Sequence, residues 1–544
     1  MLNEINRIKV ALVLIVIIVA ILFDINRFGV SKEKEYSRLV IFGDNISSSN
    51  TAFYEDDTIY LAFDTIQKFI DEDIFYDKVA NKVIITTSDN VLKFKFDDKK
   101  VSKNLEYVDF KNPMKLVSKE AYIPLSELKD IYDLDMEYNE STNTITIDKK
   151  NNDMAKIKYN KVKVYSDIST KSKIIDVLNM NDELISYTKN LSHARWSKVK
   201  TNSGAVGYIV KTNMDLEVYV ESNIDNSNNV VKEKINMFWQ YGSNLETLGL
   251  SKIEGVNVVS PTWYELKNSK GEISSKYSSS YIAQAKSYGY KVWPIITNGI
   301  DSTSYTPADT SAMLNSEYNR EQFIKNILEI VEKDKLDGIN VDFESMKTED
   351  RTLYTQFIKE LAPLLRKRNV TLSVDTYFVA YIDRKGVGKA ADYIILMGYD
   401  QRGAWSNTSG SISEVSWVEG NVKSLIEDSK IPADKIILGV PFYTRLWSEK
   451  SGDLKPSTKI FTMKDCLEYI KTNNLTPVFD EDAGQNYVEH KKGDVTYKLW
   501  IEDSTSIAKR IDTIKKYNLS GIAGWRKGLE TSDVWKTIND KLFK

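Results

Sequence analysis

The sequence is poor in the side chains that bind metals or form disulfide bonds. Its 544 residues include one cysteine, Cys466, so no disulfide can form within the chain. The two histidines, His193 and His490, lie far apart in the sequence. Little material therefore remains for a histidine-rich metal site or a Ser-His-Asp triad, and we expect neither a metal nor another cofactor.

An excess of one charge is also missing. The net charge is −3, from 74 Lys and Arg against 77 Asp and Glu, and no basic patch predicts a nucleic-acid partner. A hydrophobic content of 42% and a charged content of 28% describe a globular protein of more than one domain. Carboxylates, 31 Tyr and 10 Trp are the groups left for chemistry and for contacts with sugars.

Only one long apolar run is present, from Val10 to Phe23, and Arg7 and Lys9 precede it. The run is short for a full span, but no small-residue cleavage site follows it. We expect residues 1–30 to form an uncleaved signal anchor that crosses the cell membrane once, with everything after residue 30 outside the cytoplasm. The alternatives are a cleaved signal peptide, which would make the protein secreted, and a buried soluble helix.

Residues 36–150 contain an internal repeat with an offset of 62 residues, in which Ile59-Tyr60-Leu61 matches Ala121-Tyr122-Ile123. Each copy predicts a strand, a helix and a hairpin that turns at Asn81 or Asn143. The pattern resembles the N-terminal domain of copper amine oxidases. These residues hold no His or Cys, so we expect a binding or spacer module without copper, with a purely structural module as the alternative.

Two further segments precede the largest domain. Residues 155–217 have short alternating strands and resemble a bacterial SH3-like β-barrel, a class whose members often bind cell-wall peptide or glycan. Residues 218–230 are rich in Asn and Ser, which is typical of a flexible linker.

Residues 231–544 alternate short apolar runs with amphipathic runs, which predicts an α/β fold, a (β/α)8 TIM barrel. The stretch between Trp447 and Ser520 is too long for one helix and predicts an α+β insertion. The expected strands are Ile235 to Trp239, Val256 to Ser260, Val292 to Thr297, Gly338 to Glu344, Thr371 to Thr376, Tyr393 to Tyr399, Ile436 to Val440 and Gly521 to Trp525.

The fourth expected strand carries three polar side chains on one face, Asn340, Asp342 and Glu344. The opposite face is apolar, which argues against an ordinary solvated edge strand. The catalytic groups of (β/α)8 enzymes lie at the carboxyl ends of the strands. Two close carboxyls raise one another's pKa, so one can stay protonated as a general acid.

Asp337 to Glu344 resembles the Asp-Gly-x-Asp-x-Asp-x-Glu signature of glycoside hydrolase family 18, the chitinase-like barrels. Met397-Gly-Tyr-Asp400 and Trp525 resemble the segments that follow the sixth and eighth strands in that family. Asn340 stands where chitinases have an Asp, and an amide cannot exchange a proton as a carboxyl can. The same Asn occurs in the branch that resembles spore cortex-lytic N-acetylglucosaminidases.

The resemblance implies a substrate-assisted mechanism with a role for each matched residue. Glu344 protonates the glycosidic oxygen, Asp342 holds the acetamido N–H of the sugar, and Tyr399 binds the acetamido oxygen. Trp525 forms the floor of the site, supported by Asp400. Further candidate substrate-binding residues are Met397, Asn340, Tyr443, Arg445, Trp263 and Trp239.

These features together predict a membrane-anchored, extracytoplasmic glycosidase, and we expect a monomer. The expected substrate is β-1,4-linked N-acetylglucosamine in peptidoglycan, including that of the spore cortex. A chitinase is the first alternative, and a sugar-binding lectin without activity is another. A third is a wall-bound scaffold with a vestigial barrel. The presence of Glu344 argues against the lectin, because such lectins usually lose this residue.

Overall fold

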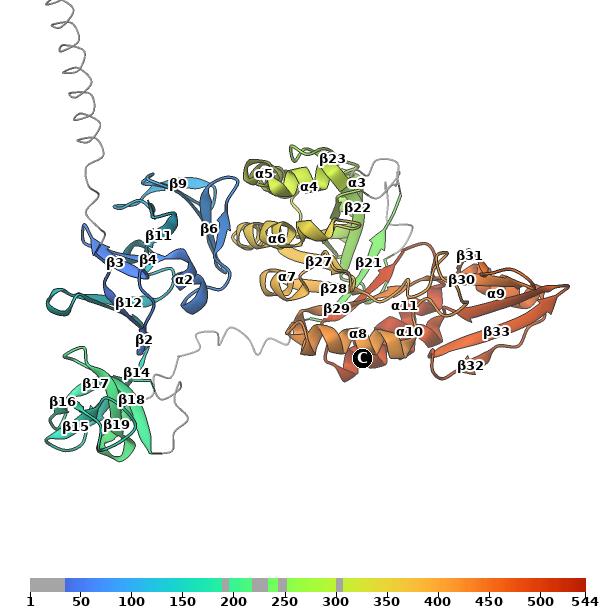
Figure 1. The fold of residues 1–544 in the computed structure, drawn as a ribbon. Helices are drawn as coiled ribbons and strands as arrows, with labels where there is room; N and C mark the ends of the chain where they lie inside the picture. Colours follow the sequence, from blue (N-terminus) through green and yellow to red (C-terminus); the bar gives the residue numbers. More distant parts are fainter. Residues whose placement is uncertain (1–34, 188–194, 218–232, 243–251, 300–306) are drawn as a thin grey trace, which may run out of the picture. The chain divides into compact units, whose positions relative to one another are not determined.

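The computed structural model describes residues 35–187, 195–217, 233–242, 252–299 and 307–544 (Figure 1). No helix among these residues is long and apolar enough to cross a membrane. The anchor expected in residues 1–30 lies outside them. The chain divides into two compact units. The described part of the first unit comprises residues 35–72, 96–99, 109–187 and 195–217. The second unit, called the barrel unit here, comprises 73–95, 100–108 and the described residues from 233 onward.

The core of the barrel unit is a closed sheet of eight parallel strands, as the sequence predicts (Figure 1). The sheet closes because the first strand pairs with both the second and the last. The third strand is interrupted and consists of two short pieces. In chain order the strands are β21 (Ile235–Gln240), β22 (Val258–Leu266), β24 (Lys291–Val292) with β25 (Ile295–Thr297), β26 (Gly338–Asp342), β27 (Thr371–Thr376), β28 (Tyr393–Met397), β29 (Ile436–Pro441) and β35 (Gly521–Trp525).

Helices follow most of these strands and cover the outside of the sheet (Figure 1). They bury the outward residues of the strands in one large apolar cluster, to which Ile339 and Val341 of β26 belong. Residues of the opposite parity, such as Asn340, point into the barrel. The helices are α3 (Ser279–Ser287), α4 (Pro307–Asn315), α5 (Glu317–Asp334), α6 (Arg351–Arg366), α7 (Arg384–Ala390), α8 (Val415–Glu427), α10 (Ser504–Lys516) and α11 (Ser532–Leu542).

An α+β insertion separates the last two barrel strands, as expected from the length of this stretch. Its antiparallel sheet has the order β31-β30-β34-β33-β32, and α9 (Met463–Thr472) packs with it. The strands are β30 (Tyr443–Lys450), β31 (Ser457–Thr462), β32 (Val478–Asp480), β33 (Gln485–Lys492) and β34 (Val495–Ile501). The insertion begins at Tyr443, four residues before the expected start at Trp447.

The two repeat copies share strands and turns, but they differ in their helices. The first copy has β4 (Thr58–Ala62), α2 (Phe63–Phe69), β5 (Phe75–Asp77) and β6 (Lys82–Thr86); the second has β11 (Glu120–Pro124), η1 (Leu125–Leu128), β12 (Leu134–Asn139) and β13 (Thr144–Lys149). Both expected turns are confirmed, with Asn81 and Asn143 at φ 55 and 46. The helix expected in the second copy is wrong, because η1 is only a 3-10 turn. β12 begins earlier in its copy than β5 does and leaves less chain for a helix.

The first unit contains the remaining strands of the repeat segment and a separate sheet in residues 153–217. The repeat segment forms two four-stranded sheets, β12-β13-β1-β2 and β10-β11-β4-β3, completed by β1 (Arg38–Ile41), β2 (Asp44–Ile46), β3 (Ala52–Glu55) and β10 (Lys115–Val117). The separate sheet of residues 153–217 has the order β16-β15-β19-β18-β17-β14-β20 and surrounds its own apolar cluster. Its strands are β14 (Asp153–Ile157), β15 (Val162–Tyr165), β16 (Ile174–Leu178), β17 (Glu183–Ser186), β18 (Trp196–Thr201), β19 (Val206–Val210) and β20 (Met214–Glu217).

Part of the repeat segment belongs to the barrel unit. β5 and β6 form one sheet with β7 (Val91–Lys95), β8 (Lys100–Lys103) and β9 (Glu106–Asp109). Ile84 on β6 and Val91 on β7 are buried in the same apolar cluster as the helices of the barrel. The sequence did not predict this packing.

A buried ionic cluster accompanies the apolar contact. The ammonium of Lys93 on β7 lies 2.8 Å from Glu317, 3.0 Å from Glu321 and 3.0 Å from Glu360. Arg320 lies 3.0 Å from Asp77 and 3.3 Å from Glu360. The side chains of Lys93 and Arg320 are 3% and 0% exposed. Each buried cation therefore has carboxylate partners, which buried charges require.

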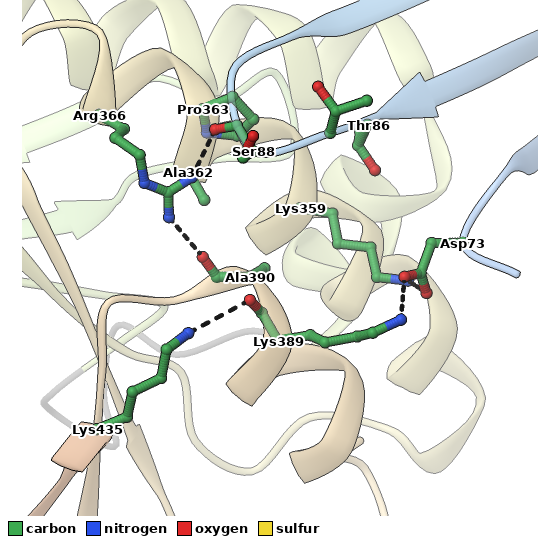
Figure 2. Close-up of a pocket in the computed structure, with 11 residues that line it drawn as sticks. Asp73, Thr86, Ser88, Lys359, Ala362, Pro363, Arg366, Lys389, Ala390 and Lys435 are labelled. Atoms are coloured by element: carbon green, nitrogen blue, oxygen red, sulfur yellow. Dashed lines mark hydrogen bonds and ion pairs between the residues drawn. The ribbon is translucent and has the colours of Figure 1, made fainter. Parts of the chain in front are cut away.

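Residues from both ends of the β5–β6 hairpin, from α6 and from the end of α7 line a cavity of about 440 Å³, whose wall carries three Lys and one Arg (Figure 2). Lys359 and Lys389 bind the two oxygens of Asp73 at 2.7 and 2.6 Å. Arg366 donates to the carbonyl of Ser88 at 2.6 Å, and Lys435 donates to backbone carbonyls near the end of α7. These contacts link β5 and the turn after β6 to α6 and α7, so we interpret the cavity as part of the packing seam.

We predict that Lys93→Met destabilises the barrel unit by about 3 kcal/mol, because it removes the buried cation that three carboxylates share. Each of these carboxylates then keeps only one other cation: Lys82 for Glu317, Lys325 for Glu321 and Arg320 for Glu360. Urea unfolding followed by tryptophan fluorescence measures the change. Lys325→Met is the matched control, since Lys325 pairs with Glu321 at 2.7 Å but is 42% exposed and should contribute little. Equal unfolding midpoints for the two variants would contradict a stabilising role for Lys93.

Candidate active site

A cavity of about 590 Å³ opens at the carboxyl ends of β26, β27 and β28. This is the face on which (β/α)8 enzymes carry out catalysis. Four of the predicted site residues line it: Glu344, Met397, Tyr399 and Asp400. The other lining residues are Tyr377, Phe378, Val379, Tyr381, Leu396, Trp405, Trp417 and Asn421.

Asp342 and Glu344 occupy different depths at the end of β26. Asp342 is the last residue of the strand and is 9% exposed, whereas Glu344 lies just beyond the strand and is half-buried. Asn298 holds the backbone of Glu344 on both sides. Its side chain accepts from the Glu344 N–H at 2.9 Å and donates to the Glu344 carbonyl at 2.9 Å. The fixed backbone places the Glu344 carboxyl at the rim of the cavity.

Asn340 is fully buried one step below Asp342 and takes part in a chain of hydrogen bonds. The indole N–H of Trp239 donates to its Oδ1 at 2.8 Å, and its Nδ2 donates to Oδ1 of Asp375 at 2.7 Å. Trp239 is itself fully buried, so its visible role is to hold Asn340. Asp375, on β27, is a third carboxyl in the site.

Asp400 follows β28 and lines the same cavity as Glu344, and the first strand of the insertion holds it. The hydroxyl of Tyr443 donates to Asp400 Oδ1 at 2.6 Å. Burial raises the pKa of Asp400, while the Tyr443 hydrogen bond and the nearby Arg445 lower it. The insertion thus contributes two of the predicted substrate-binding residues to the site.

Aromatic rings form the inner wall. Trp239 contacts Trp525 with ring centres 5.7 Å apart and Tyr399 with centres 6.4 Å apart, and Tyr443 lies 6.4 Å from Tyr399. Trp525 is partly exposed and can present its face to a ligand.

The structure places Trp263 elsewhere. It is 1% exposed and packs against Tyr277 and Tyr281 in the outer apolar cluster, away from the carboxyl groups. Its position is linked to an irregularity in β22 between Thr262 and Tyr264, where the pairing with β25 shifts register.

The electrostatics of the site favour protonated acids. Burial, together with Glu344 and Asp375, holds the pKa of Asp342 well above its usual range. Burial, together with Asp400, also raises the pKa of Glu344. A carboxyl that keeps its proton near neutral pH can act as a general acid. The described residues contain no cluster of His, Cys, Asp or Glu arranged to hold a metal ion.

Several residues of the site were not predicted from the sequence, and only some of them lie in a pattern that could have identified them. Asp375 shares a face with Ser373 on a predicted strand, so its alternation was available as a signal. Trp405 is 63% exposed and Phe378 is 38% exposed at the mouth of the cavity. Both lie outside helices and strands, so no periodic pattern of hydrophobic and polar residues identifies them.

The family model for glycosyl hydrolases family 18 matches residues 256–529, half of the chain, and the chain belongs to this family of glycosidases. A second model, for the copper amine oxidase N-terminal domain, matches residues 40–147. The two principal family resemblances of the sequence are therefore confirmed.

Curated relatives are similar over the same region. The Uncharacterized glycosylase YvbX of Bacillus subtilis (strain 168) is 26% identical over 282 residues, which cover 49% of this chain and 80% of the relative. The Cortical fragment-lytic enzyme of Bacillus anthracis is 24% identical over 281 residues, or 49% of this chain and 64% of that enzyme. The match thus spans less than two thirds of the cortical enzyme.

Among solved structures, a chitinase from Chromobacterium violaceum ATCC 12472 aligns with a TM-score of 0.50 and 20% identity. The alignment covers 57% of this chain and all of the chitinase. At this identity the likeness shows a shared fold.

Glu344→Gln should lower kcat by about 10² to 10⁴-fold, because the amide keeps the shape of the side chain but has no proton to donate. Binding of an N-acetylglucosamine oligomer, followed by tryptophan fluorescence, should be retained. Glu349→Gln is the matched control, since Glu349 is exposed and lies shortly after Glu344 in the chain. Undiminished turnover by Glu344→Gln would remove Glu344 from the role of acid.

Proposed function

We propose that this chain is a membrane-anchored, extracytoplasmic glycosidase that cleaves β-1,4-linked N-acetylglucosamine glycans of peptidoglycan. It acts by a substrate-assisted mechanism that retains the configuration at the anomeric carbon. The acetamido carbonyl of the sugar before the cut attacks the anomeric carbon, and water later opens the cyclic oxazolinium intermediate.

Each residue has the role that the family resemblance implies, and its position in the site supports that role. Glu344, at the rim, donates a proton to the leaving glycosidic oxygen. Asp342, one step deeper, accepts the acetamido N–H and balances the positive charge of the oxazolinium. The hydroxyl of Tyr399 binds the acetamido oxygen, and Trp525 provides an apolar floor for the sugar. Asp400, which also lines the cavity, supports Trp525.

The observation that carries this proposal is the placement of Asp342. It is buried one inward step from Glu344, and no ion pair in the described part of the chain reaches its carboxyl. A positive charge beside a carboxylate in such a place stabilises it strongly, because a buried carboxylate without a partner is costly. The oxazolinium supplies that charge only during the reaction, so the interaction favours the intermediate over the bound substrate.

The proposed location rests on the N-terminal sequence and on the accessory segments. Residues 1–30 have the basic flank and apolar run of a signal anchor, and the SH3-like resemblance of residues 155–217 suits a wall ligand. Protease added to intact protoplasts should digest the barrel unit. Protection of the barrel unit from the protease in intact protoplasts would place it in the cytoplasm and contradict this topology.

The cortical fragment-lytic relatives support spore cortex as the first peptidoglycan to test. Chitin is the second candidate, because the exposed Trp405 and Phe378 at the cavity mouth also suit stacking on a polysaccharide without peptides.

Digestion of purified spore cortex, vegetative wall and chitin oligomers, with mass spectrometry of the products, distinguishes the two substrates. We expect cortex fragments with N-acetylglucosamine at the reducing end, since the acetamido group before the cut belongs to that sugar. Glu344→Gln protein is the control for contaminating hydrolases. Cleavage of chitin oligomers alone would contradict the peptidoglycan assignment and make the protein a chitinase.

A further inference from the structure

The third carboxyl, Asp375, lies beside Asp342 and has no role in the mechanism above. β26 and β27 pair in parallel from Gly338 with Thr371 to Val341 with Val374, so Asp342 and Asp375 occupy the next positions along the two strands. The charge of Asp375 acts on Asp342 and raises its pKa, in keeping with this register. Paired residues of adjacent parallel strands point to the same side of the sheet. Both carboxyls therefore lie side by side within the barrel, and Asp375 is only 2% exposed.

The hydrogen-bond chain below them fixes the orientation of Asn340. The indole nitrogen of Trp239 can only donate, so the amide oxygen must face Trp239 and the amide NH2 must face Asp375. Asn340 thus donates a hydrogen bond that stabilises the ionised form of Asp375. Asp342 has no such donor: its Oδ1 is buried without a hydrogen-bond partner among the described residues.

The surroundings supply no compensating cation. No ion pair in the described ranges involves Asp342 or Asp375. Burial raises the pKa of Asp375 well above its usual range, Asn340 opposes this shift, and Glu344 adds to it. The other titratable groups that act electrostatically with this pair are the hydroxyls of Tyr354 on α6, Tyr377 after β27 and Tyr399 after β28, and Arg445 acts on Asp400.

We propose that Asp375 is the charged partner of Asp342: the pair holds one proton in the free enzyme, with Asp375 as the carboxylate that Asn340 stabilises and the proton on Asp342. Two adjacent buried carboxyls share a proton because both cannot ionise at low cost. The inference rests on the proposed role of Asp342 at the acetamido group.

This arrangement provides a route for the proton that Asp342 must lose before it can balance the positive charge of the sugar. As positive charge develops on the sugar, the O–H bond of Asp342 breaks and an O–H bond forms on Asp375. Asp342 becomes the carboxylate that faces the oxazolinium, and no proton leaves the site. Asp375 does not touch the substrate and acts as a positioning residue for the charge of Asp342. Asp375, on the neighbouring strand, thereby accepts the proton of Asp342, which the amide of Asn340 cannot do.

Carbon-13 NMR of protein with labelled aspartate carboxyls tests the pair directly, with signals assigned by their loss in Asp342→Asn and Asp375→Asn. At pH 7 the wild-type Asp342 signal should be that of a protonated carboxyl and the Asp375 signal that of a carboxylate. In Asp375→Asn, the titration midpoint of Asp342 should fall by about one pH unit or more, because the adjacent negative charge is gone. Ser373→Ala, one step below on the same face of β27, is the matched control and should leave the midpoint unchanged.

A second variant keeps the test decisive if Asp375→Asn does not fold. Trp239→Phe removes the indole donor and frees the Asn340 amide to turn, so the midpoint of Asp375 should rise. An ionised Asp342 at pH 7 in the wild type, or a midpoint that does not move in these variants, would overturn the proposal. The titration needs no substrate, so its failure is distinguishable from the failure of the peptidoglycan assignment.

Discussion

The burial of carboxyl groups at the end of β26, without a cation beside them, is the constraint on which the site depends. An ionised carboxylate in such surroundings is costly, so the group either keeps its proton or needs hydrogen-bond donors. The barrel supplies donors selectively. Asn340 serves Asp375 and Tyr443 serves Asp400, whereas Asp342 has no donor at Oδ1. Burial raises the pKa of all of these acids, and the donors oppose that shift at Asp375 and Asp400 but not at Asp342.

A second group of buried acids in the same unit shows the contrasting solution. Glu317, Glu321 and Glu360 surround the ammonium of Lys93. Burial opposes the ionisation of Glu321, but Lys93 and Lys325 together outweigh it and lower the pKa of Glu321 to about 2. The acids of the active site shift the other way. The presence or absence of a cation thus distinguishes structural acids, which join β7 to the helices, from reactive ones.

The sequence predicted the features that leave a local pattern. The barrel strands appear as short apolar runs because parallel strands are buried on both faces, and the acidic face of β26 appears as an alternation. The direction of a side chain at a strand end was less visible. Trp263 lies in the outer cluster after a shift in register, and Trp239 lies beneath Asn340 rather than in the open cavity. Neither placement follows from spacing alone.

Contacts between distant segments left no pattern. Lys93 meets Glu317 across 224 residues of sequence, and nothing near either residue marks the other as its partner. The alternation with Ser373 showed the face on which Asp375 lies, but a single acid on an apolar strand does not indicate a function until its neighbour on β26 is known. Its significance depends on the register of two strands, which only the folded barrel fixes.

The central claim is that the substrate's own acetamido group displaces the leaving group, and the configuration of the first product tests it most directly. Two successive displacements at one carbon return the β anomer, whereas a single attack by water gives the α anomer. Proton NMR of a fresh digest, recorded before mutarotation, reads the anomer as it forms. The account predicts the β anomer first. If the α anomer appears first, Glu344 and Asp342 do not perform the roles assigned to them.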